Sequence, residues 1–109
     1  MALVRETLRK IAELLRENDQ LDRAVIVEDA VVGDDQKLDT FLVSNDLWGG
    51  SGSIADSGGL MRTGERIERT RRIEDALIAL GVEQIRQRKV NPRTSMWVTA
   101  FSKWKAMGI

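Results

Sequence analysis

Apolar residues recur three or four positions apart along most of this chain of 109 residues, and one glycine-rich stretch interrupts them. Because an α-helix turns once in about 3.6 residues, that spacing gathers apolar side chains on one helical face. It predicts amphipathic helices over about residues 3–17, 37–47 and 64–80, and another beginning near Pro92. We therefore expect an all-α fold: one compact domain over residues 1–109, a bundle of about four to five helices with a Gly-rich loop at 48–64.

The stretch from Leu21 to Val32 fits two kinds of structure. From Ala24 to Val32 it is an almost continuous apolar block rich in β-branched residues, which is typical of a buried strand. Leu21, Val25 and Val32 nevertheless fall on one side of a helix, the pattern of a helix buried on most sides. The alternative to the all-α fold is therefore an α+β fold with short strands near 24–32 and 40–44.

Glycine, proline and capping residues predict where the later helices begin and end. Gly81 indicates the end of the helix that starts near residue 64, so that 82–90 becomes a short helix or an extended link. Asn91 can cap the last helix, Pro92 suits its first turn, and Gly108 ends it. The apolar face of this helix follows a helical spacing and comprises Trp97, Ala100, Phe101, Trp104 and Met107.

The composition narrows the chemistry open to the chain. It contains neither histidine nor cysteine, which excludes imidazole and thiolate metal sites and every nucleophile activated by histidine. An enzyme is therefore disfavoured, since it would have to use carboxylates, lysine, arginine or hydroxyls; an acid–base pair of Asp46 and Asp56 is conceivable. We expect no metal and no cofactor. Without cysteines or a long apolar run, we expect a cytoplasmic protein with no membrane segment.

The glycine-rich stretch is the most unusual feature of the chain. Six of the nine glycines lie between Trp48 and Gly64, and their backbone N–H groups could bind an anion or a nucleotide phosphate. The candidate anion-binding residues are Gly49, Gly50, Ser51, Gly52, Ser53, Arg62 and Arg66. The alternative is a structural turn in which Ser53 caps a short helical segment, with Asp56 three residues later.

The same stretch carries a resemblance to a known family. Trp48, Gly49, Gly50, Gly52, Ser53 and Asp56 follow an N-terminal helix that contains Leu8, Leu14 and Leu15. Residues 8–56 thus resemble a family of small bacterial proteins of unknown function with a Tyr/Trp-Gly-Gly-x-Gly-Ser-x-x-Asp segment about thirty residues after a Leu-rich helix. The resemblance implies a mostly helical fold and no established activity.

Aromatic and charged residues indicate how the chain could meet a partner. Trp97, Phe101 and Trp104 are either core residues or an interface between helices. Residues 1–60 carry 6 basic and 12 acidic residues, and residues 61–109 carry 11 and 5, so the halves are oppositely charged. They could complement each other within one chain or between two. A basic face for nucleic acid is disfavoured because the net charge is zero.

These observations favour a small, non-catalytic protein-interaction module, accessory or immunity-like, that binds a protein partner or a second copy of itself. An anion- or nucleotide-binding domain is the alternative, and nucleic-acid binding by the basic half is the weaker one.

Overall fold

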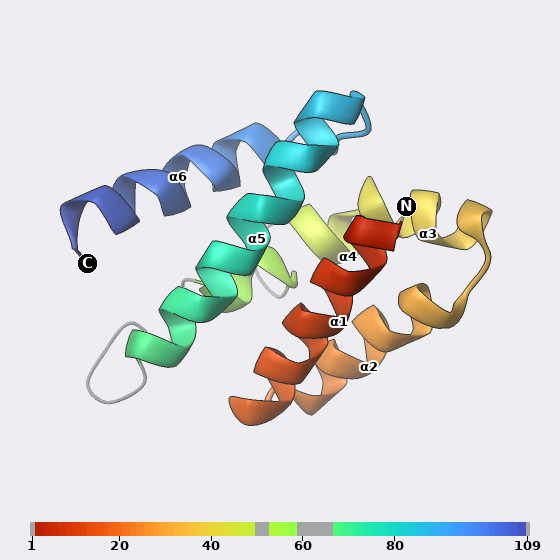
Figure 1. The fold of residues 1–109 in the computed structure, drawn as a ribbon, viewed down its shortest axis with the longest axis horizontal. Coiled ribbons are helices and arrows are strands. Elements are labelled where there is room, and N and C mark those ends of the chain that lie inside the picture. The colour runs from red at the N-terminus through yellow and green to blue at the C-terminus, as the bar shows by residue number, and fades with distance from the viewer. Residues whose placement is uncertain (1, 50–52, 59–66, 109) are drawn as a thin grey trace.

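The computed structural model describes residues 2–49, 53–58 and 67–108, and every regular element among them is helical (Figure 1). The elements are α1 (Ala2–Glu17), α2 (Leu21–Val32), α3 (Asp35–Leu42), α4 (Asn45–Trp48), the short 3₁₀ helix η1 (Ala55–Gly58), α5 (Ile67–Gln87) and α6 (Thr94–Met107). The all-α prediction is confirmed. The two stretches of the α+β alternative lie in α2 and at the end of α3, and neither is a strand.

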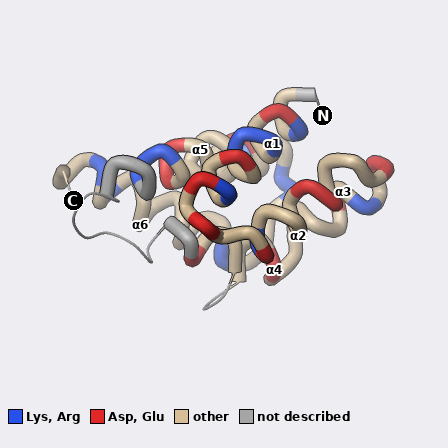
Figure 2. Tube along the Cα trace, turned by 90° about the horizontal axis from the view of Figure 1, so that it is seen from below, with Lys and Arg blue, Asp and Glu red and all other residues tan. Residues whose placement is uncertain are grey.

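The helices form two layers. Seen from below, α1 and α5 lie on one side of the molecule, whereas α2, α4 and α6 lie on the other (Figure 2). Helix α1 packs against α2 and α5, and α5 packs against α6 and η1. None of the helices that the structure describes combines the length and apolar character needed to cross a membrane.

Helix α1 forms the centre of the core because its apolar residues recur at helical spacing, as the sequence predicts. Its buried residues are Val4, Leu8, Ile11, Ala12, Leu14 and Leu15. Helix α2 faces them with Ala24, Val27, Ala30 and Val31, which are also buried. Small side chains at such a contact let two helix axes approach closely.

The helix predicted over 37–47 is in fact two helices. Helix α3 starts at Asp35, where the Asp34 carboxylate accepts the N–H of Lys37 at 2.8 Å as an N-cap. The chain leaves the helix at Val43, and the hydroxyl of Ser44 then caps α4 by accepting the N–H of Leu47 at 3.3 Å. The division follows from the Ser44 cap, which the apolar spacing alone does not reveal.

The prediction that Gly81 ends a helix is wrong, because α5 continues through it to Gln87. A Cβ atom at Gly81 would lie 2.3 Å from Val98 Cγ2 and 3.2 Å from Trp48 Cη2. Glycine is present here so that α6 and the Trp48 ring can approach the α5 backbone closely. The helix instead ends near Arg88, whose φ of 59° lies in the left-handed region.

The start of α6 differs from the prediction by two residues. Asn91 lies outside the helix: its side-chain oxygen accepts the N–H of Arg93 at 2.9 Å, and its own N–H donates to the hydroxyl of Thr94 at 3.0 Å. The helix therefore begins at Thr94 and not at Pro92. Its predicted end is confirmed, since Gly108 is the C-cap with a φ of 74°.

A buried polar network joins α4 to α5 and to the link before α6. Trp48 Nε1 donates to Gln84 Oε1 at 2.8 Å, and Gln84 Nε2 donates to the carbonyls of Leu42 at 2.7 Å and Lys89 at 2.8 Å. Both Trp48 and Gln84 are buried. The network places the end of α4 against the long helix α5.

Candidate functional site

Gly49 is used for close packing. Its carbonyl accepts both Trp97 Nε1 and Ser53 Oγ at 3.0 Å, and its N–H donates to the carbonyl of Asn45 at 2.8 Å. A Cβ atom at this position would lie 2.3 Å from that same carbonyl oxygen. The residue is therefore glycine because the backbone of α4 comes too close for a side chain.

Ser53 caps the short helix η1. Its hydroxyl accepts the N–H of Asp56 at 3.2 Å, which agrees with the structural interpretation of this segment, and the N–H of Ile54 donates to the carbonyl of Asp46 at 2.8 Å. Gly50, Ser51, Gly52, Arg62 and Arg66 lie outside the described residues. The anion-binding hypothesis therefore stays a prediction, and the backbone N–H groups of Gly49, Ile54 and Asp56 already have acceptors within the chain.

We expect Gly49→Ala to lower the free energy of unfolding by about 1–3 kcal/mol, because the added methyl group meets a backbone oxygen that cannot move independently. Urea denaturation measures this change. Gly33→Ala is the matched control: there a Cβ atom would meet the flexible side chain of Lys37, so the cost should stay below about 0.5 kcal/mol. Equal losses in the two variants would contradict the packing role of Gly49.

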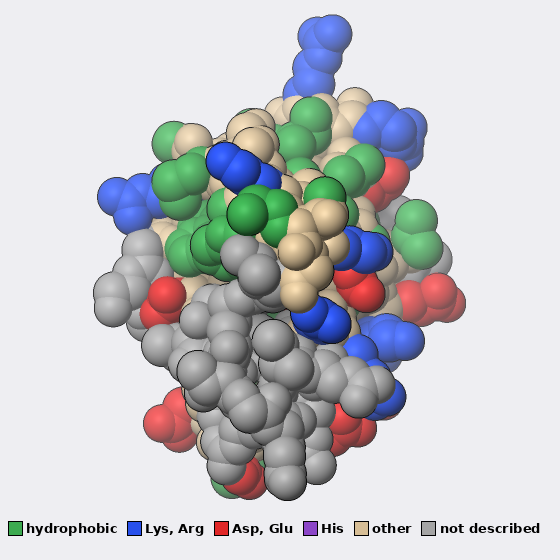
Figure 3. Space-filling model, turned by 90° about the vertical axis from the view of Figure 1, so that its left-hand side faces the viewer, with side chains coloured by type: hydrophobic (Ala, Val, Ile, Leu, Met, Phe, Trp, Pro, Cys, Tyr) green, Lys and Arg blue, Asp and Glu red, His purple; other side chains and the backbone are tan. Residues whose placement is uncertain are grey.

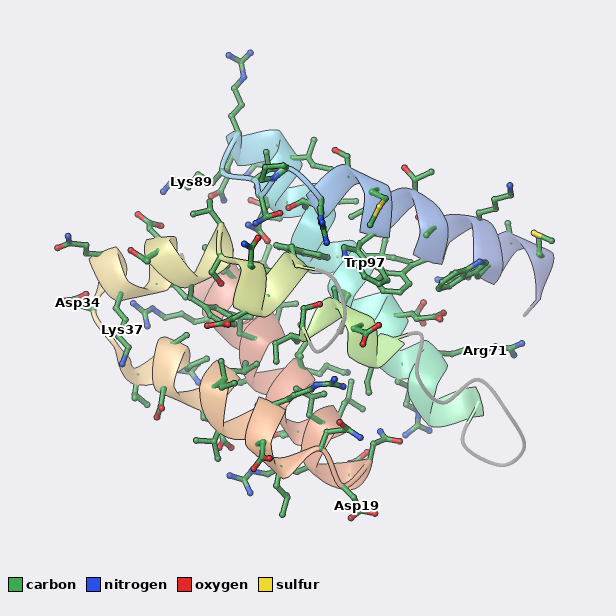
Figure 4. All side chains as sticks on the ribbon, turned by 180° about the vertical axis from the view of Figure 1, so that it is seen from behind. Asp19, Asp34, Lys37, Arg71, Lys89 and Trp97 are labelled. Atoms are coloured by element: carbon green, nitrogen blue, oxygen red, sulfur yellow. The ribbon has the colours of Figure 1, made fainter. Side chains whose placement is uncertain are left out.

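The three aromatic residues of α6 occupy different environments. Phe101 is fully buried, and its ring lies 5.3 Å from that of Trp97 and 5.7 Å from that of Trp104, measured between centroids. Trp97 is half-buried, and its Nε1 points back to the end of α4, where it donates to the carbonyls of Trp48 and Gly49 (Figure 4). The core interpretation thus holds for Phe101, whereas Trp97 and Trp104 remain partly exposed.

The two aspartates of the conceivable acid–base pair have different surroundings. Asp46 is exposed on α4, while Asp56 is half-buried in η1 with a carboxylate oxygen 3.9 Å from Arg23. Within the described ranges, no three carboxylate-bearing side chains gather as a metal site would require.

Most of the ion pairs given for the described part of the chain join residues of the same half. Of the ion pairs among the described residues, one joins the halves, between Lys89 and Asp39 at 3.2 Å. The other pairs join residues of the same half: Arg5–Asp35, Arg16–Glu28, Arg23–Asp56, Arg86–Glu83 and Lys105–Asp75. The segment from Leu21 to Trp48 holds seven acidic and two basic residues and so keeps a net charge of −5.

The structure exposes an apolar surface on α2. Leu21, Val25 and Val32 are 53%, 46% and 82% exposed, although the opposite side of the same helix is apolar and buried. With Glu28 they recur at positions i, i+4, i+7 and i+11, which follow one face of a helix. We call these four residues the α2 stripe. The apolar stretch of α2 is visible in the sequence, but there it predicts a helix that is buried on most sides, not one with an exposed apolar face.

The border of the α2 stripe is acidic. Asp22 and Asp29 are exposed and form no ion pair with any residue in the described ranges. Glu28 accepts two hydrogen bonds from Arg16, at 2.8 and 2.6 Å, and these bonds hold the pKa of its carboxyl below the usual value. The Glu28 carboxyl therefore stays ionised at neutral pH, with Arg16 paired to it.

A groove of about 550 Å³ continues the α2 surface toward α3. Its apolar lining comes from Ile26, Ala30 and Phe41. The acidic side chains of Asp34 and Asp46 also line the groove. Asp34 and Lys37 lie close together where α2 passes to α3 (Figure 4). The surface as a whole combines aliphatic area with negative charge, a combination suited to apolar contact with a cationic neighbour.

Helix α6 carries a second exposed stripe with the opposite charge. Met96 and Met107 are 53% and 61% exposed, and with half-buried Ala100 and exposed Lys103 they again occupy positions i, i+4, i+7 and i+11. We call these four residues the α6 stripe. Viewed from the side on which the C-terminus lies, the upper part of the molecule shows apolar side chains among those of Lys and Arg (Figure 3).

Comparison of the chain with protein-family models, with curated protein sequences and with solved structures found no match. The resemblance of residues 8–56 to a bacterial family accordingly stays a prediction.

Proposed function

We propose that this chain is a non-catalytic protein-interaction module whose principal contact surface is the α2 stripe with its acidic border. The observation that carries the proposal is a helix that is apolar on both sides and covered on one. Contiguous apolar area edged by charged residues is typical of surfaces that bind other proteins.

The energetics support a partner at this surface. Burying one large aliphatic side chain contributes roughly 1.5–3 kcal/mol relative to leaving it in water. The three aliphatic members of the α2 stripe are about half exposed or more, so a partner that covers them would recover part of that energy. The α6 aromatic residues proposed as an interface would contribute through Trp97 and Trp104, since Phe101 is buried.

We expect a photoreactive residue at position 25 to crosslink to a partner protein in cells that produce this chain. p-Benzoylphenylalanine replaces Val25, the cells are irradiated, and denaturing gel electrophoresis followed by mass spectrometry identifies the adducts. A discrete adduct is the expected result, because Val25 lies in the middle of the exposed stripe. The mass of the adduct distinguishes another protein from a second copy.

The matched control places the same residue at Glu13, which is exposed on α1 in the other layer. This position should give no adduct of the same mass. Val25→Gln in the same chain should leave unfolding within about 0.5 kcal/mol of wild type, because an exposed valine contributes little to the folded monomer. If position 25 crosslinks no more than position 13, the α2 stripe is not a contact surface.

A further inference from the structure

The two exposed stripes match each other in spacing and oppose each other in charge. Both follow the positions i, i+4, i+7 and i+11, and the third position is Glu28 in α2 but Lys103 in α6. Helix α6 contains no acidic residue. Lys103 forms no ion pair with any residue that the structure describes, so its charge is free to meet a partner.

We propose, building on the interaction function above, that the occupant of the α2 stripe is the α6 stripe of a second copy of this chain. Arg16 partly neutralises Glu28, so Asp22 and Asp29 at the border supply most of the negative charge that faces Lys103 and Arg93 of the partner copy. A contact between two α2 stripes would instead place two acidic borders together, which repel each other.

The arrangement of the helices allows both contacts to form at once. Helices α2 and α6 lie in the same layer, away from α1 and α5 (Figure 2), and both appear on the near side when the molecule is viewed from behind (Figure 4). A two-fold axis that places α2 of one copy against α6 of the other makes the same contact a second time with the roles of the copies exchanged. With 12 and 14 residues, the helices are about 18 and 21 Å long and match in length.

Sedimentation equilibrium on the full chain and on two charge-reversal variants tests this proposal. Wild type should behave as a dimer at 100 μM or below. Asp22→Lys with Asp29→Lys, and separately Arg93→Glu with Lys103→Glu, should each weaken self-association at least tenfold, because each variant puts like charges into both contacts. An equimolar mixture of the two variants should associate more strongly than either alone, because both contacts of the mixed dimer join opposite charges: one is the wild-type contact, and the other joins the two reversed surfaces.

The matched control, Glu6→Lys with Glu13→Lys, makes the same charge change on exposed positions of α1 and should leave the association constant within about twofold of wild type. Far-ultraviolet circular dichroism verifies that each variant is folded. Val25→Gln, which changes no charge, should also weaken the dimer. This variant tests the proposal if a charge-reversal variant does not fold.

A monomeric wild type at 100 μM, or a dimer that none of the α2 and α6 substitutions weakens, overturns the proposal. A different result would contradict the proposed interaction function: the absence of any crosslinked adduct from position 25. An adduct with a different protein and a monomeric wild type would together retain the interaction function and reject the dimer.

Discussion

Replacing Gln84 by leucine should lower the free energy of unfolding by about 2–4 kcal/mol. The glutamine is 1% exposed and joins the Trp48 indole N–H to two backbone carbonyls, those of Leu42 and Lys89. Leucine has a similar volume but can neither donate nor accept, so three polar groups lose their partner at once. A buried group without a partner costs about 1–3 kcal/mol, and partial hydration of the exposed link at Lys89 reduces the total. Urea denaturation followed by tryptophan fluorescence measures the change.

Two further variants separate the contribution of the buried hydrogen bonds from the general effect of replacing a glutamine side chain. Gln87→Leu changes the same residue type one turn later, where the amide bonds only to Glu83 at the surface, and should cost less than about 0.5 kcal/mol. Trp48→Phe removes the indole donor, so the double variant Trp48→Phe with Gln84→Leu should cost less than the sum of the single changes. Equal effects of the Gln84 and Gln87 changes would show that the buried network contributes nothing to stability.

The sequence predicted most of the fold because most helices here bury one regular face. Helix α1 and the end of α6 at Gly108 follow from apolar spacing and from a residue suited to a left-handed backbone. Gly81 was misinterpreted because glycine is a poor helix former, so its presence predicts an end. A glycine is needed at position 81 because Trp48 and Val98, which are distant in the sequence, pack against the helix backbone there. This packing overrides the low helix propensity of glycine.

The candidate site was only partly accessible to the same reasoning. The Ser53 cap could be recognised from residue types, but the hydrogen bond from Trp97 Nε1 to the Gly49 carbonyl depends on where tertiary packing places α6. The α2 stripe was missed because an apolar block does not reveal which of its sides another element covers. Helix α1 covers one side of α2, and that choice is made by tertiary packing.

Phe101→Ala should produce the largest single loss of stability, about 3–5 kcal/mol, and should act first on α6. The ring is fully buried between Trp97 and Trp104, and among the described elements α6 has its main contact with α5 alone. Removing the ring leaves a cavity and takes away the central contact of that packing. Hydrogen exchange measured by mass spectrometry should therefore show faster exchange throughout α6 while α1 keeps most of its protection.

Val82→Ala is the matched control for this change, because it removes aliphatic carbons from a side chain that is 53% exposed on α5. It should cost less than about 1 kcal/mol and leave exchange in α6 as in wild type. Uniform acceleration of exchange in α1 and α6 of Phe101→Ala would mean that α6 unfolds only together with the whole chain. Selective acceleration would instead show that one aromatic residue holds α6 on the molecule, and with it the α6 stripe that the proposed dimer requires.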